Sequence, residues 1–118
     1  MKPNSRNVEI LKRIIGYCNE ISSTLEIVNH DYETMMSNFL YKNSLAMNVL
    51  QIGELVKNLT ADFKQKHRDM PWGDIAGMRD IAAHGYGDFD FSVLWETVNE
   101  DIELLKSFCQ KSIEELKA

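Results

Sequence analysis

Apolar residues recur at intervals of three and four along almost the whole chain of 118 residues. This spacing is typical of amphipathic helix. The first such stretch runs from about Ser5, a candidate N-cap, to about Asn29. Its apolar face consists of Val8, Leu11, Ile14, Ile15, Cys18, Ile21, Leu25 and Val28. No segment shows the alternation of apolar and polar residues that indicates a half-buried strand, so we expect an all-α protein.

Further helices follow from the same periodicity. One extends from about residue 32 to 59, and the last runs from about residue 91 to 116. A short helix between them opens at Pro71-Trp72, since proline is tolerated in the first turn of a helix. The connection over residues 60–70 is polar, with one short helical turn. Three long helices and one short helix predict an antiparallel bundle, in a single domain over residues 1–118.

The composition suits a soluble globular protein: 44% of the residues are apolar and 26% are charged, enough of each for a core and a solvated surface. No apolar run approaches the roughly 18 residues that span a membrane. The polar start is followed by an amphipathic segment, unlike a signal peptide. We therefore expect a cytoplasmic protein with no membrane partner.

The cysteines and histidines do not suggest a bound metal. Cys18 and Cys109 lie on the apolar stripes of the first and last helices, which predicts reduced, buried thiols. His30, His67 and His84 lack the spacing of metal ligands. The sequence therefore predicts no metal and no other cofactor.

Charge is distributed unevenly. The net charge is −5, which at first argues against a protein that binds nucleic acid, but the distribution of charge matters more than its sum. Residues 1–84 hold ten acidic and ten basic side chains, whereas residues 85–118 hold eight acidic and three basic ones. A local basic site in the first part remains allowed. The one basic run contains Lys64, Lys66 and Arg68, which are candidate contacts for RNA or else belong to a solvated loop.

One short stretch gathers chemically capable side chains where a helix is expected to end. It reads Met78-Arg79-Asp80-Ile81-Ala82-Ala83-His84-Gly85-Tyr86-Gly87, the pattern R-x4-H-x-Y. The planar guanidinium of Arg79 suits a phosphate oxygen. The imidazole of His84 can give and take a proton near neutral pH. Tyr86 adds a hydroxyl, which two flanking glycines leave exposed.

Helix geometry limits how these side chains can act together. Asp80 and His84 are four residues apart, so they share one helix face and the carboxylate can orient the imidazole. Arg79 and His84 lie about 140° apart around a helix. They can meet at one phosphate if the helix turns at Gly85, or if a second copy of the chain completes the pair. The alternative is that Arg79 and Asp80 are solvated and His84 only caps the helix.

Gly53 and Glu54 interrupt the apolar pattern of the second helix. Glycine inside a helix costs about 1 kcal/mol relative to alanine. A close helix crossing would explain Gly53, and so would tolerance at a weak point. Glu54 is a candidate supporting carboxylate for the region of Arg79, or else it is solvated.

Together these residues resemble the HEPN superfamily. The resemblance rests on Ile52-Gly53-Glu54, Pro71-Trp72, Ile75-Ala76-Gly77-Met78-Arg79-Asp80 and His84-Gly85-Tyr86. Within the superfamily the chain looks most like the HepT-like toxins of HepT/MntA toxin–antitoxin systems. The resemblance covers nearly the whole chain, including the order of the helices.

The resemblance implies a homodimer whose motifs meet at the interface and form a metal-independent endoribonuclease. By this resemblance His84 would serve as general base or acid at the ribose 2′-hydroxyl and the leaving oxygen, giving a 2′,3′-cyclic phosphate. Arg79 would stabilise charge on the scissile phosphate. The family often has asparagine at the position of Asp80. A carboxylate there is unhelpful beside a phosphate unless it orients His84.

Tyr86 matches the family tyrosine to which a nucleotidyltransferase antitoxin adds AMP. The added bulk and negative charge beside Arg79 would exclude an RNA phosphate. The chain would then be the toxin of a type VII-like toxin–antitoxin system, with RNA and the antitoxin as partners. The alternative is a non-catalytic helical protein that binds a nucleotide or only partners a nucleotidyltransferase. A structural dimer with a vestigial motif is the third reading.

Overall fold

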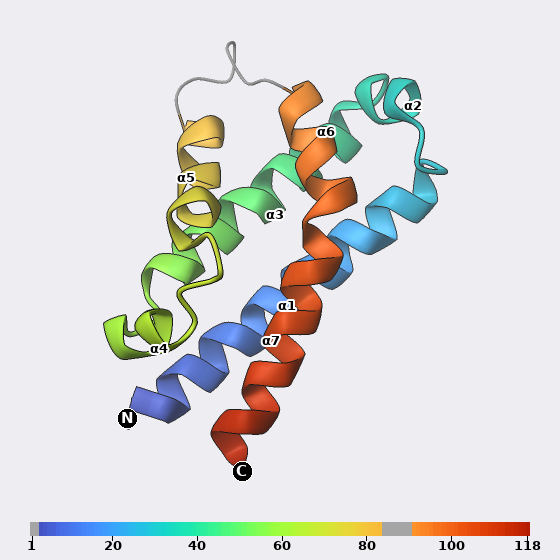
Figure 1. The fold of residues 1–118 in the computed structure, drawn as a ribbon. Coiled ribbons are helices and arrows are strands. Elements are labelled where there is room, and N and C mark those ends of the chain that lie inside the picture. The colour runs from blue at the N-terminus through green and yellow to red at the C-terminus, as the bar shows by residue number, and fades with distance from the viewer. Residues whose placement is uncertain (1–2, 84–90) are drawn as a thin grey trace.

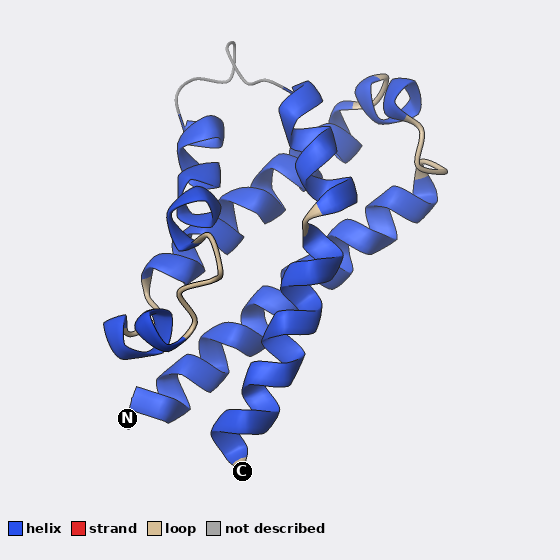
Figure 2. Ribbon diagram, in the orientation of Figure 1, coloured by secondary structure: helices blue, strands red, loops and turns tan. Residues whose placement is uncertain are grey.

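The computed structural model describes residues 3–83 and 91–118, and of residues 3 and 78–83 the backbone only. Within these ranges every regular element is a helix (Figure 2), which confirms the predicted all-α class. No described helix is both long and apolar enough to cross a membrane. The helices are α1 (Pro3–Ile27), α2 (Tyr32–Met36), α3 (Phe39–Lys57), α4 (Ala61–Lys66), α5 (Trp72–Ala83), α6 (Phe91–Glu100) and α7 (Ile102–Lys117).

The first helix supplies the centre of the core. α1 packs against both α3 and α7 (Figure 1). Its predicted stripe is buried except for Ile15, which is partly buried, and Leu11, Ile14 and Ile21 are fully buried. Each such side chain contributes about 1.5–3 kcal/mol on burial. The helix begins at Pro3, so Ser5 lies inside it and is not the N-cap that the sequence predicted.

The end of α1 is closed by a Schellman motif without glycine. The amide of His30 donates to the carbonyl oxygen of Leu25 at 2.8 Å, and that of Asn29 to Glu26 at 3.0 Å. These are the two hydrogen bonds that define the motif. Asn29 and His30 have φ of 54° and 53°, a left-handed conformation that L-residues with side chains adopt at a cost of about 1 kcal/mol. The chain reverses here into α2.

The segment predicted as one helix over residues 32–59 is two helices, α2 and α3. Asn38 separates them with an extended backbone (φ −132°, ψ 115°), and its Oδ1 accepts a hydrogen bond from the amide of Leu40 at 2.9 Å. This is an N-cap. An asparagine between two apolar stretches leaves the three- and four-residue spacing almost unchanged, so the periodicity did not reveal the break.

The last predicted helix, from about residue 91 to 116, breaks at Asp101 into α6 and α7. Asp101 occupies the N-cap of α7, but its side chain makes no capping hydrogen bond. Its amide donates to the carbonyl oxygen of Thr97 at 2.9 Å, and its carbonyl accepts from the amide of Leu105 at 3.0 Å. Helical hydrogen bonding therefore continues through the break.

Three apolar residues of the segment predicted as one helix over residues 32–59 do not enter the core. Phe39, Leu40 and Met47, on the first half of α3, are 64%, 62% and 46% exposed. We call these three residues the outer apolar patch. Their spacing in the sequence is the same as that of buried residues, so periodicity alone could not separate them from the core.

The two cysteines are free and fully buried, as predicted. Burial raises the pKa of Cys18 to about 11, and the negative charge of Glu103 adds to the effect. Burial also raises the pKa of Cys109 to about 12. Both thiols therefore stay protonated at neutral pH, and neither is a nucleophile or a metal ligand there.

The left-handed backbone of His30 predicts that His30→Gly stabilises the protein by about 0.5–1 kcal/mol, because glycine adopts positive φ without steric cost. Urea denaturation measures the change. Arg13→Gly is the matched control: this exposed position is inside α1, where glycine costs up to about 1 kcal/mol. Equal destabilisation by both substitutions would contradict the left-handed backbone conformation of His30.

The buried thiols predict slow reaction of the folded protein with a disulfide reagent at pH 8, slower than in urea by on the order of a hundredfold or more. The folded state keeps Cys18 protonated where the unfolded chain has lost the proton. The free energy of unfolding should therefore fall as pH rises from about 9 to about 11. Rapid labelling of the folded protein would show that the thiols are accessible.

Candidate active site

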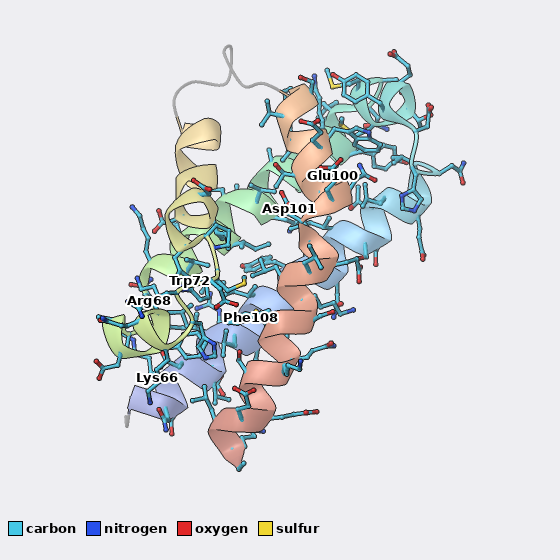
Figure 3. All side chains as sticks on the ribbon, in the orientation of Figure 1. Lys66, Arg68, Trp72, Glu100, Asp101 and Phe108 are labelled. Carbon is cyan, nitrogen blue, oxygen red and sulfur yellow. The ribbon has the colours of Figure 1, made fainter. Side chains whose placement is uncertain are left out.

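The helix that carries the predicted motif, α5, is anchored at its start by Trp72. The indole N–H donates to the carbonyl oxygens of His67 at 3.0 Å and Lys64 at 3.2 Å. The ring packs against Phe63 and Phe108, with centroid distances of 6.0 and 5.5 Å (Figure 3). A buried indole N–H usually needs a partner, and here that need ties α5 to the end of α4.

The imidazole of His67 belongs to the same aromatic cluster. Its ring centroid lies 4.7 Å from that of Phe63 and 5.1 Å from that of Phe108. His67 is therefore a packing residue that joins α4 to α7. In residues 3–83 and 91–118, no group of three His, Cys, Asp or Glu side chains could hold a metal ion.

A polar clamp fixes α4 to α1. Asn7 is 2% exposed; its Nδ2 donates to Oγ1 of Thr60 at 3.0 Å, and its Oδ1 accepts from the amide of Thr60 at 3.1 Å. Thr60 also caps α4, because its Oγ1 accepts from the amide of Phe63 at 3.3 Å. The sequence analysis missed this clamp. Its one signal is a polar residue on the apolar stripe of α1, four positions before Leu11.

From this anchor α5 runs beside α3 and ends at Ala83 (Figure 1). Arg79 and Asp80 lie near its C-terminal end, but their side chains are outside the described part of the structure. His84 and Tyr86 lie outside the described residues altogether. The backbone thus places the first half of the motif at the end of α5, and the predicted pairings among these four side chains remain predictions.

The Gly-Glu pair lies on α3, the helix beside α5. Gly53 is buried, which favours a close approach of another element over tolerance at an exposed weak point. Glu54 is half-buried. Both interpretations of Glu54, a supporting carboxylate and a solvated one, therefore stay open.

The basic run lies far from the end of α5. Lys66 and Arg68 are exposed and lie at the α4 end of the bundle (Figure 3). Lys64 is half-buried and belongs to α4 itself. The 12 residues of α5 span about 18 Å at 1.5 Å per residue. The structure therefore does not bring these cations together with the end of α5 within one chain.

The chain is similar to probable and putative ribonucleases over most of its length. The family model described as Ribonuclease HepT-like matches residues 8–112. A probable ribonuclease HepT of Thermococcus cleftensis is 36% identical over 100 residues, which cover 80% of this chain and 91% of the relative. A putative RNase of Methanocaldococcus jannaschii is 31% identical over 104 residues, 88% of each protein.

Another relative shows the same similarity within a longer protein. It is a gamma-glutamylcyclotransferase and putative RNase of Methanocaldococcus jannaschii, 33% identical over 106 residues. These cover 85% of this chain but 47% of the relative, so the chain matches about half of that protein. No solved structure matches the chain significantly. The family model covers most of the chain, and on this evidence the chain belongs to the HepT-like ribonuclease family of the HEPN superfamily, as its motifs predicted.

Proposed function

We propose that this chain is a metal-independent endoribonuclease whose active site contains Arg79 and His84. The observation that carries the proposal is the family match over residues 8–112, which includes both residues. His84 takes the proton of the ribose 2′-hydroxyl, whose oxygen attacks the adjacent phosphorus, or returns a proton to the departing 5′-oxygen. Arg79 stabilises the additional negative charge on the phosphate. The products are a 2′,3′-cyclic phosphate and a free 5′-hydroxyl.

The site is completed, in this proposal, by a second copy of the chain. A homodimer relieves the constraint that Arg79 and His84 point about 140° apart on one regular helix. The outer apolar patch supports an interface, since its three exposed apolar side chains lie on one helix and a partner could cover them. The patch lies on α3, which contacts both α5 and α6, the helices on either side of the motif segment.

Two carboxylates support the site in this proposal. Asp80 orients the imidazole of His84, four residues later. A carboxylate in any other role beside the phosphate would repel its negative charge. Glu54 is half-buried on the helix beside α5, a position suited to holding the guanidinium of Arg79. A carboxylate in that role fixes the direction of the cation.

Binding of the RNA away from the scissile bond falls to Lys64, Lys66 and Arg68. Their distance from the end of α5 suits contacts with phosphates that flank the cleaved one. The sugar-phosphate backbone supplies most of the sequence-independent attraction to such cations. The acidic α6 and α7 segment is unsuited to the same role.

His84→Ala should lower the rate of RNA cleavage by about 10²–10⁴-fold, the usual contribution of a general acid or base. Purified protein is incubated with RNA in excess chelator, and the product ends are identified by mass. His30→Gly is the matched control, because it removes an exposed histidine of α1's terminal turn and should leave cleavage unchanged.

Two outcomes would contradict this function. Cleavage that persists in His84→Ala would remove His84 from the mechanism, and cleavage abolished by chelator in the wild type would show a metal requirement. If neither protein cleaves and both are folded dimers, the chain is the nucleotide-binding or nucleotidyltransferase-partner protein of the alternative.

We further propose that the chain is the toxin of a toxin–antitoxin pair and that Tyr86 is its regulatory residue. The Tyr86 oxygen attacks the α-phosphate of ATP on a nucleotidyltransferase antitoxin, which forms AMP-tyrosine and releases pyrophosphate. Two points support this proposal. Tyr86 occupies the last position of the R-x4-H-x-Y pattern, where it resembles the family tyrosine, and it lies within residues 8–112, which the family model matches. The added phosphate would repel RNA from Arg79.

Tyr86→Phe should therefore accept no AMP, because it lacks the attacking oxygen, and it should stay toxic beside substoichiometric nucleotidyltransferase. Intact-protein mass and growth on co-expression measure the two effects. Tyr17→Phe, a change on α1, should be modified and neutralised like the wild type. Neutralisation of Tyr86→Phe by catalytic amounts of the partner would exclude the modification as the regulatory step.

A further inference from the structure

A cavity of about 410 Å³ lies where the start of α5 faces the break between α6 and α7. Its apolar walls include Ile75, Ile102 and Leu105, while Asp74 and Asp101 bring carboxylates to it. The volume falls in the range of about 300–1,000 Å³ that ligand-binding pockets occupy. None of these residues belongs to the R-x4-H-x-Y motif, which lies at the other end of α5.

The two carboxylates of this cavity lie at the N-terminal ends of α5 and α7, where each has a favourable interaction with the helix dipole. Asp101 occupies the N-cap position of α7 without making a capping hydrogen bond. Asp74 and Asp101 are both exposed, and neither has an ion-pair partner in the described part of the chain. Glu100 adds a third negative charge beside Asp101 (Figure 3). The surface around the cavity therefore attracts cations.

The apolar surface extends outside the cavity. Leu104 lines it and is 72% exposed, more than any other large apolar side chain whose exposure is described. Covering such a side chain would remove its apolar surface from water, which favours binding. A free small molecule held inside the cavity would leave most of Leu104 in water, whereas a polypeptide laid across the opening would cover it.

We propose that this cavity, with Leu104 at its edge, binds a basic amphipathic segment of a partner protein. One apolar side chain of that segment fills the space between Ile75, Ile102 and Leu105. Arginine or lysine beside it pairs with Asp74 and Asp101. RNA does not suit the surface, because its phosphates meet unpaired carboxylates. The proposal does not depend on ribonuclease activity or on the modification of Tyr86.

The probe for this site is an N-acetylated, C-amidated helical peptide with leucines along one face and arginines flanking them. Binding should shift the NMR signals of Ile75, Leu104 and Leu105 in the full chain. A peptide with glutamate in place of arginine should not bind. Higher salt should weaken binding of the arginine peptide, because its ion pairs with Asp74 and Asp101 form at an exposed edge, where salt screens them.

Two variants test the two halves of the recognition. Leu104→Asp removes the exposed apolar contact, and Asp74→Asn with Asp101→Asn removes the charges; each should weaken peptide binding by at least about tenfold. The matched control, Glu20→Gln with Glu114→Gln, removes two exposed carboxylates elsewhere and should bind normally. Because every changed side chain is exposed, circular dichroism should show the wild-type fold.

Three results would overturn the proposal. Equal weakening by the control pair, or shifts spread over the whole acidic surface, would mean attraction by net charge alone. Concentration-dependent self-association lost in Leu104→Asp would mean that a second copy covers the cavity. The same shifts produced by an RNA oligonucleotide, but not by the peptide, would assign the surface to nucleic acid.

Discussion

The burial of one apolar stripe, that of α1, is the contact on which the other helices depend. α3 and α7 both pack on it, and α5 reaches the bundle through α3 and through the aromatic contacts of Trp72. The position of Arg79 is thus set indirectly: α1 supports α3, α3 supports α5, and Trp72 fixes the start of α5. A cavity in the α1 stripe would loosen the end of α5 without touching the motif, because close-packed interiors transmit small displacements.

Charge is separated along the molecule in a way that net charge does not show. The cations Lys66 and Arg68 lie at the α4 end, whereas Glu100 and Asp101 lie at the break between α6 and α7 (Figure 3). In the described part of residues 85–118 the acidic excess lies on α6 and at Asp101, because α7 carries three acidic and three basic side chains. A polyanion and a basic protein would be drawn to different places on this surface. A negative net charge is therefore compatible with an RNA-binding site of limited size.

The helices, the buried thiols and the family could be predicted from the sequence, because each depends on residue type and local spacing. The helix breaks at Asn38 and Asp101 could not be predicted. Neither break contains glycine or proline, and the three- and four-residue spacing of apolar residues continues past both. The end of the first helix near Asn29 was predicted correctly, but the left-handed backbone of Asn29 and His30 was not, because neither residue is glycine. Exposure of Phe39 likewise depends on which helices pack beside it, and spacing does not encode that.

For the candidate site, residue chemistry could be predicted but arrangement could not. Arginine and histidine suggested phosphate chemistry, and helix geometry showed that one regular helix cannot aim both at one phosphate. A turn at Gly85 or a second copy of the chain would resolve that conflict, and residue spacing does not distinguish between them. The basic run illustrates the limit: it is near the motif in sequence, yet the length of α5 separates Lys66 from Ala83.

The two proposed interfaces use different parts of the surface, and this has a consequence for regulation. The outer apolar patch lies on the first half of α3, whereas the cavity lies between the start of α5 and the α6–α7 break. A second copy and a protein partner could therefore be bound together. A partner held at the cavity would be about 18 Å from the end of α5. One small domain of that partner could therefore reach both places. Docking there would raise its effective concentration at the motif, so an enzyme that modifies the motif would not need tight binding at the modified residue itself.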